Sequence, residues 1–233
     1  MRTLWIAGAS ASLLFLHGVM GVAQTTAPAP SIELKRDDRQ GQLQVLIDGR
    51  EAVAYQYAAD LDLPHYYPVR SPSGKPLTVQ YPDDRHSHHR SIWVNDIVQP
   101  PNHEPISFYA IGLKEDSRRT AKGFRDCIRH VKFLGEDVAG GKATIRTLAT
   151  WLADFGQLRV LDKHRRLRVV PLGRGEYLLD LQFEVQATYG DMRIVSEWNH
   201  YAWPYVRMHP KFGVVGGGTI TNSAGGINEQ GTH

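Results

Sequence analysis

The residues with the greatest chemical capacity lie between Asp83 and Arg90, in the run DDRHSHHR. This run places His86, His88 and His89, three of the eleven histidines of the chain, beside two carboxylates. Imidazole titrates near neutral pH and is a common metal ligand, so the run could transfer protons or hold a metal ion. It is the first candidate for a functional site, and a polar solvent-exposed loop is the alternative.

An extended backbone would divide these side chains between two faces. Because alternate residues of a strand point the same way, His86, His88 and Arg90 would share one face and His89 would lie on the other. His86 and His88 could then bind one divalent metal ion, with a neighbouring aspartate as a third ligand or as a partner that orients a ring. Only one of the two adjacent histidines would face a given pocket, unless a bulge turns the chain.

Aromatic residues beside polar groups form further candidates. Such rings can stack on the apolar face of a sugar while neighbouring side chains bind its hydroxyls. His65, Tyr66 and Tyr67 form one group before Pro68, and Trp203 lies in a second. Tyrosines buried in a core, with satisfied hydroxyls, are the alternative for these residues.

A proline-bracketed segment follows the histidines. His103 and Glu104 lie between Pro101 and Pro105, which disfavour helix and hold the chain extended. We expect a rigid polar loop that could form a pocket wall, and an ordinary surface loop is the alternative.

The elements that must position these residues are predicted to be strands. Leu43, Val45 and Ile47 alternate with polar residues before an Asp48-Gly49 turn, which is typical of a β-hairpin. The clearest strand covers residues 177–187, and shorter strands are predicted at 91–94, 128–134, 143–151, 166–170 and 192–198. This pattern predicts an all-β protein, an antiparallel β-sandwich or barrel.

The chain is predicted to begin with an export signal. Residues 1–23 have a positive start, an apolar stretch and small residues at the end, and residues 24–30 form a proline-rich tether. We therefore expect a periplasmic or secreted protein, with one β-sandwich domain over residues 31–233 and no membrane segment after signal cleavage. Cys127, the single cysteine, permits no intramolecular disulfide and is expected to be a buried thiol.

Composition and motifs exclude several classes of function. The 27 Lys and Arg against 24 Asp and Glu give a net charge of +3 without a basic patch interleaved with aromatics, so no nucleic-acid partner is expected. The glycine run at 213–218 matches neither a phosphate-binding loop nor a dinucleotide fingerprint, and no GxSxG motif occurs. Composition does not predict the oligomeric state.

Several motifs together resemble a known family. The runs YPDDRHSHHRSIW, HEPISFY and HPKFGVVGGGTITNSAGGINEQGTH resemble, in order, the bacterial family of unknown function commonly labelled methane oxygenase PmoA. The resemblance covers residues 55–233 and implies a secreted β-sandwich like that of galactose mutarotase relatives, found among carbohydrate-utilisation proteins. It also implies that the C-terminal part of the domain is truncated here. The oxygenase label itself fits poorly, because the true methane monooxygenase subunit is an integral membrane protein.

The resemblance also assigns positions to a site. It places His88, His89, Arg90 and Trp93 at the centre, with Asp84 just before them. The later motif matches at Arg207, His209, Asn222 and Glu229. Ser91 departs from the family, because many members have glycine there.

These observations lead to one principal hypothesis and two alternatives. The principal one is a carbohydrate-active enzyme, a lyase, epimerase or hydrolase, in which His88 or His89 is acid or base and Asp84 or Glu229 is the partner carboxylate. Its substrate-binding residues are predicted to be Arg90, Trp93, His65, Tyr67, His103, Glu104, Arg207, His209 and Asn222. The alternatives are a non-catalytic sugar-binding module with a stacking platform of Tyr66, Tyr67, Trp93 and Trp203, and a metal-dependent oxygenase using His86 and His88.

Overall fold

The computed structural model describes residues 29–82, 86–113, 115, 118–195 and 203–228, and these residues form an all-β protein. The first sheet has the strand order β1-β2-β3-β4-β5-β15, and the second has the order β10-β11-β12-β13. Two small sheets, β14-β6-β7 and β8-β9, complete the pairing. All pairs are antiparallel, as predicted.

The strand bounds are β1 Ile32–Asp37, β2 Gln42–Ile47, β3 Arg50–Gln56, β4 His65–Val69, β5 Ile92–Trp93, β6 Ile97–Gln99, β7 Ile106–Ser107, β8 Arg119–Thr120, β9 Gly123–Phe124, β10 Cys127–Ala139, β11 Lys142–Ala153, β12 Leu158–Gly173, β13 Glu176–Gln186, β14 Arg193–Ile194 and β15 Tyr205–Val206. The 3₁₀ turns that lie wholly within the described residues are η3 Asp154–Gly156, η4 Pro210–Phe212 and η5 Val214–Gly216.

The first predicted hairpin is confirmed as β2 and β3. Ile47 pairs with Arg50, so the turn consists of Asp48 and Gly49 alone. Both have positive φ, 50° and 73°, which is the geometry of a tight two-residue hairpin turn. Val45 pairs with Val53, which puts the apolar residues of both strands on one face.

The second sheet is a meander of long strands that extends the predicted runs. The turn at Gly140 and Gly141, again with positive φ, joins β10 to β11. Along β13 the odd-numbered apolar residues from Tyr177 to Val185 pack against the core, as their alternation predicts. The run predicted at 192–198 is shorter, because only Arg193 and Ile194 form a strand and residues 196–198 lie outside the described residues.

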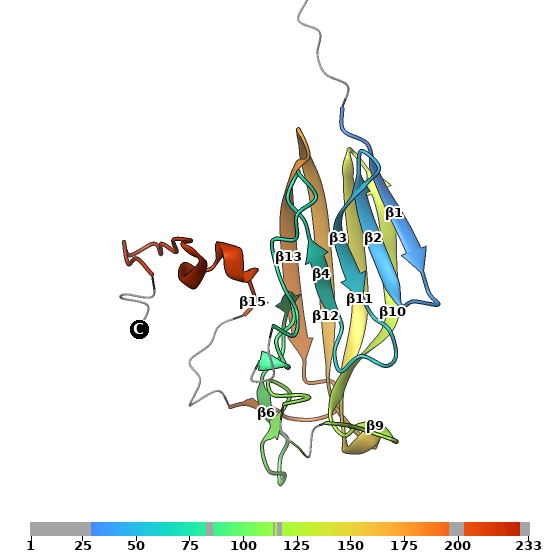
Figure 1. Cartoon of the computed structure of the whole chain (residues 1–233). Coiled ribbons are helices and arrows are strands. Elements are labelled where there is room, and N and C mark those ends of the chain that lie inside the picture. The colour runs from blue at the N-terminus through green and yellow to red at the C-terminus, as the bar shows by residue number, and fades with distance from the viewer. Residues whose placement is uncertain (1–28, 83–85, 114, 116–117, 196–202, 229–233) are drawn as a thin grey trace, which may run out of the picture.

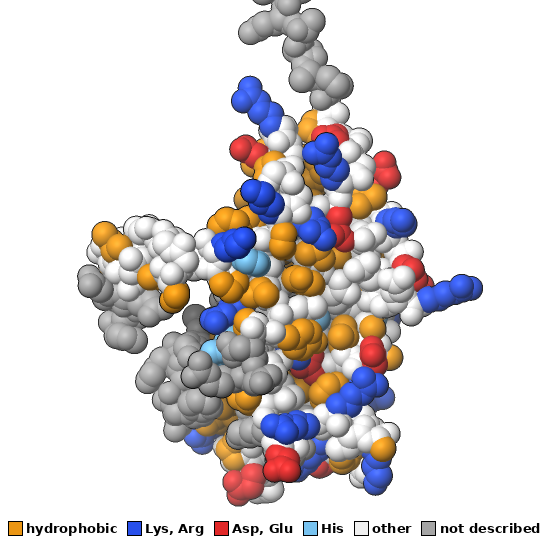
Figure 2. Space-filling view, in the orientation of Figure 1, with side chains coloured by type: hydrophobic (Ala, Val, Ile, Leu, Met, Phe, Trp, Pro, Cys, Tyr) orange, Lys and Arg blue, Asp and Glu red, His pale blue; other side chains and the backbone are white. Residues whose placement is uncertain are grey.

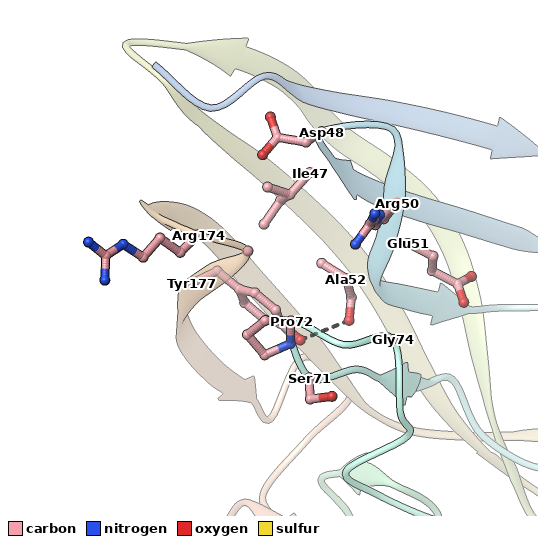
Figure 3. A pocket seen from close by; sticks show the side chains of 11 residues that line it. Ile47, Asp48, Arg50, Glu51, Ala52, Ser71, Pro72, Gly74, Arg174 and Tyr177 are labelled. Carbon is pink, nitrogen blue, oxygen red and sulfur yellow. Dashed lines mark hydrogen bonds between the residues drawn. The ribbon is translucent and has the colours of Figure 1, made fainter. Parts of the chain in front are cut away.

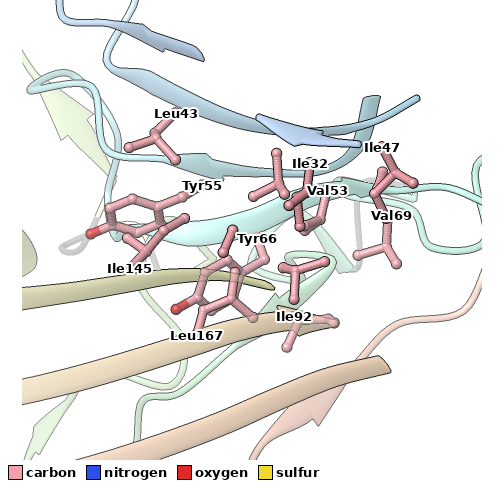
Figure 4. Close-up of a cluster of buried hydrophobic side chains, with 14 residues drawn as sticks. Ile32, Leu43, Ile47, Val53, Tyr55, Tyr66, Val69, Ile92, Ile145 and Leu167 are labelled. Atoms are coloured by element: carbon pink, nitrogen blue, oxygen red, sulfur yellow. The ribbon is translucent and has the colours of Figure 1, made fainter. Parts of the chain in front are cut away.

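The two main sheets pack face to face and share one core (Figures 1 and 4). The first sheet supplies Leu43, Tyr55 and Tyr66, and the second supplies Ile145 and Leu167. A second core, which includes Trp93, Phe108 and Trp151, lies toward the end marked by β6 and β9. The predicted β-sandwich is therefore confirmed.

The surface matches the composition. Lys and Arg side chains are spread among Asp and Glu over the face in Figure 2. Cys127 is buried and free, and burial raises the pKa of its thiol. Within the described part of the chain, no helix has the length and apolar character needed to cross a bilayer. The predicted signal and most of the tether lie outside the described residues.

Candidate functional site

The histidines occupy a turn, so the division of their side chains that an extended backbone would impose does not occur. The backbone N–H of His89 donates to the carbonyl of His86 at 2.9 Å, and the N–H of Tyr81 donates to the carbonyl of His89. The turn brings the rings of His86 and His89 to 4.8 Å and those of His88 and His89 to 4.3 Å between centroids. The two adjacent histidines therefore lie together instead of on opposite faces.

The histidine turn, residues 86–90, packs against a wall of aromatic rings. His88 contacts Tyr109 at 5.2 Å, and His89 contacts Trp93 at 5.5 Å between centroids. Tyr205 from β15 stacks on Trp93 and contacts Tyr109. The site therefore joins three distant segments, and the sequence reasoning did not assign Tyr109 to it.

His88 carries the most unusual polar atom of this cluster. Its side chain is 5% exposed, and its Nδ1 is buried without a hydrogen-bond partner among the described residues. Burial, reinforced by the positive charges of Arg90 and Arg207, lowers the pKa of His88 to about 4. The ring is therefore neutral near pH 7 and has a nitrogen available for a partner.

Arg90 is held by protein groups. Its Nε donates to Oδ1 of Asp62 at 3.2 Å, and its Nη2 donates to Oδ2 of the same residue. Its Nη1 donates to the carbonyls of Ser87 and His89, at 2.7 and 3.0 Å. Four of the five N–H groups of the guanidinium are thus used, and together they hold the turn to Asp62. The guanidinium carbon of Arg90 also lies 4.0 Å from the centroid of the Tyr81 ring.

Asp62 is the buried counterpart that the sequence reasoning missed. Asp62 and Arg90 are 1% and 3% exposed at their side chains. Burial raises the pKa of Asp62, while the guanidinium and the backbone N–H of Leu63 oppose that shift. A buried, bidentate pair of this kind fixes geometry more than it adds stability.

A cavity of about 400 Å³ opens beside the histidine turn, and we call it the turn cavity. Ser87, Arg90 and Tyr81 line it on the side of the turn. Asp60, between β3 and β4, and Arg119, in β8, pair at 3.6 Å and also line it. Its volume falls within the usual range for small-molecule sites.

His65 lies on the outer face of the first sheet. Its Nδ1 is 3.0 Å from the carbonyl of Leu63, and its Nε2 is 2.7 Å from Oε1 of Gln80. Burial lowers the pKa of His65 to about 4, so the ring is neutral. A neutral ring donates through one nitrogen, so if Nδ1 donates, the Gln80 amide must turn its NH₂ toward Nε2. His65 and Tyr67 line a second cavity of about 290 Å³, the outer-face cavity.

The predicted stacking platform is not assembled. Tyr66 is 3% exposed and belongs to the core between the sheets, whereas Tyr67 lines the outer-face cavity. Trp93 is also buried, and its Nε1 donates to Oδ1 of Asn95 at 3.1 Å. Trp203 donates from Nε1 to Asp96. Consecutive residues of β4 face opposite sides of the sheet, so Tyr66 and Tyr67 cannot form one platform.

The other predicted binding residues lie in two places. His103 and Glu104 share a turn between β6 and β7, where Nδ1 of His103 lies 2.7 Å from the carbonyl of Glu104. Arg207 joins the first sheet, because its N–H donates to Ser91 and its carbonyl accepts from Val79. These backbone bonds place residue 207 next to the strand that follows the histidine turn.

The later motif lies mainly in a segment beside the sandwich (Figure 1). The ring of His209 caps η4 by accepting from the N–H of Lys211. Oδ1 of Asn222 accepts from the N–H groups of Ala224 and Gly226, and so closes its own turn. Asp84 and Glu229 lie outside the described residues.

The predicted metal site gains no support from the described residues. Among them, no group of three or more His, Cys, Asp or Glu side chains is placed to hold a metal ion. His86 and His88, the two predicted ligands, each pack a ring against His89.

Two buried cations lie between the sheets behind the site. Lys163 is fully buried, donates from Nζ to the carbonyl of Val94 at 2.6 Å, and has a pKa that burial lowers well below the usual value. Arg165 donates to the carbonyl of Pro64 and to the hydroxyl of Tyr55. The alternation from Lys163 through Arg165 to Leu167 was the available signal, because these residues share one face of β12.

A third cavity, of about 320 Å³, lies at the other end of the sandwich (Figure 3). It is formed where the β2–β3 and β12–β13 turns meet the 71–74 turn. Tyr177 points into this region and donates from its hydroxyl to the carbonyl of Ala52 at 2.9 Å. None of its lining residues was among the predicted site residues.

Fold and site together define an all-β sandwich protein with a histidine-rich turn beside two adjoining cavities. The chain belongs to a family of unknown function, DUF6807, whose model matches residues 42–233. The match therefore includes the histidine turn, the turn and outer-face cavities and the later motif. Comparisons with the curated proteins and with the solved structures found no match.

Proposed function

We propose that this protein is an exported carbohydrate-active enzyme that transfers a proton at a sugar bound beside the histidine turn. The observation that carries this proposal is the buried Nδ1 of His88, which has no hydrogen-bond partner among the described residues and lies next to residues that line the turn cavity. A sugar hydroxyl could give that nitrogen the partner it lacks, and a neutral imidazole is ready to accept a proton. Arg90 and Asp62 would hold the turn in place.

Export of the protein and a carbohydrate substrate are also part of this proposal. Export to the periplasm or beyond follows from the apolar leader, and a carbohydrate substrate follows from the resemblance to the family labelled PmoA. Polar side chains stand among the lining residues, with Ser87 and Arg90 in the turn cavity and Gln42 and Gln56 in the outer-face cavity, and such groups bind the hydroxyls of a sugar. An oxygenase would need a third metal ligand beside His86 and His88, and the neighbouring aspartates predicted for that role lie outside the described residues.

Replacement of His88 by asparagine tests the enzymatic role. Asparagine keeps a hydrogen-bonding group near the position of Nδ1 but cannot transfer protons, so we expect turnover to fall about 10²-fold or more with ligand affinity retained. His164→Asn, on the outer side of β12, is the matched control and should leave turnover unchanged. Product formation from neutral polysaccharides and oligosaccharides, followed by ¹H NMR, is the measurement. Equal turnover in wild type and H88N would contradict the proposal.

A non-catalytic sugar-binding module is the second candidate. It is favoured by the outer-face cavity, where Tyr67 lies beside polar side chains. This candidate predicts measurable glycan affinity with no product from any sugar, and no effect of His88→Asn on that affinity.

A further inference from the structure

The outer-face cavity and the turn cavity adjoin. Leu61 lines both of them, and the consecutive residues Gln80 and Tyr81 line one each. Their volumes are about 290 and 400 Å³. The two hollows therefore follow one another from the outer face of the first sheet to the histidine turn.

The strand register builds a polar floor for the outer-face cavity. Gln42 pairs with Gln56, and Gln56 pairs with His65, so these three side chains form one row across β2, β3 and β4. Paired residues of antiparallel strands project from the same face, while the intervening Leu43, Tyr55 and Tyr66 enter the core. Tyr67 and Gln80 complete the wall around the row.

The charged groups of both cavities are matched. In the outer-face cavity Nε of Arg70 donates to Oε1 of Glu51 at 2.7 Å. In the turn cavity Arg90 pairs with Asp62, and Arg119 pairs with Asp60. Every Asp, Glu and Arg among the described lining residues thus has an ion-pair partner, which favours a neutral ligand rich in hydroxyl groups over an anionic one.

We infer that the two cavities are adjoining subsites of one groove for a neutral oligosaccharide. This inference rests on the proposed function and specifies its substrate: the sugar at the histidine turn is one unit of a chain whose neighbouring unit lies over the first sheet. The ring of Tyr67 stacks on that neighbouring unit, and the amides of Gln42 and Gln80 bind its hydroxyls.

Calorimetric titration with manno-, xylo- and cello-oligosaccharides of one to six units, and with oligogalacturonides as acidic probes, tests the inference. We expect affinity for one neutral series to rise about tenfold or more from the monosaccharide to the trisaccharide. Tyr67→Ala should remove that gain and leave monosaccharide affinity unchanged, and Tyr67→Phe should restore it, because the stacking ring is kept. Tyr189→Ala, an exposed tyrosine beside Asp162, is the control and should bind like wild type.

The possible failures are distinguishable. Three results would overturn the groove and leave the proposed function standing. They are an affinity that does not depend on chain length, an equal loss of affinity for monosaccharide and trisaccharide in Y67A, and a preference for oligogalacturonides. If no sugar of any series binds to the wild-type protein, both the groove and the proposed function fail. Thermal unfolding of Y67A checks that the sandwich is intact, and Y67F decides the outcome if Y67A does not fold.

Discussion

Removal of one partner of the Arg90–Asp62 pair should destabilise the protein strongly. Arg90→Gln leaves the Asp62 carboxylate buried at 1% exposure and takes the donors from the carbonyls of Ser87 and His89. Breaking a buried ion pair in this way costs about 3–5 kcal/mol. In a chain of 233 residues that corresponds to a fall of roughly 10 °C in the unfolding midpoint.

The double-mutant cycle separates the pair from its surroundings. Asp62→Asn should also cost several kcal/mol, whereas the double variant, without a buried charge, should lose less than the sum by about 2 kcal/mol. Arg119→Gln is the matched control. Its pair with Asp60 is 3.6 Å long, with side chains 56% and 64% exposed, and such pairs contribute about 1 kcal/mol or less.

Urea denaturation at pH 7 measures all of these variants. If R90Q costs less than about 1 kcal/mol, or if the two single changes add without coupling, the structural role assigned to Arg90 is refuted. If Arg90 served substrate binding alone, the role predicted from the sequence, R90Q would keep its stability and lose only ligand affinity.

Two further predictions concern the buried ring of His65 and the space around the backbone of Gly41. His65 has a pKa of about 4 in the folded state, whereas the unfolded chain protonates near 6.5, so the free energy of unfolding falls as the pH drops from 7. At pH 4.5 this residue accounts for a loss of about 2–3 kcal/mol. Urea denaturation of His65→Asn should therefore show a flatter dependence of stability on pH. A profile as steep as that of wild type would exclude His65 as the cause. Gly41→Ala should lower the free energy of unfolding by about 3 kcal/mol or more, because φ is +61° there and a Cβ would lie 2.3 Å from Cα of Ala58. In the control Gly49→Ala, φ is also positive but the Cβ meets nothing within 4 Å, so the loss should be about 1 kcal/mol. Thermal unfolding measures both variants. Equal losses at the two glycines would contradict the contact at Ala58.

The fold was predictable where alternation continues over many residues. The β2–β3 hairpin and β13 carry apolar residues at every second position, which a half-buried strand requires. The histidine turn was mispredicted because the run DDRHSHHR has no apolar residue to set a period. Its conformation depends on the hydrogen bond from His89 to His86 and on the guanidinium of Arg90.

The partners of the site residues were not predictable from one sequence. Asp62 lies 28 positions before Arg90, and no local pattern marks it as the counterion. Tyr109 and Tyr205 reach His88 and Trp93 only because segments that are far apart in the sequence meet at this end of the sandwich. By contrast, the inward positions of Lys163 and Arg165 followed the alternation of β12, but cations are normally expected in solvent.

The most direct test of sugar binding at the histidine turn is an NMR titration of ¹⁵N-labelled protein with the neutral oligosaccharide series. We expect shifts of the Tyr81, Ser87 and Arg90 amides, which surround the turn cavity, while Arg174 and Tyr177 at the third cavity stay unchanged. Shifts centred on Arg174 and Tyr177, or no shift with any sugar of the series, would contradict this expectation.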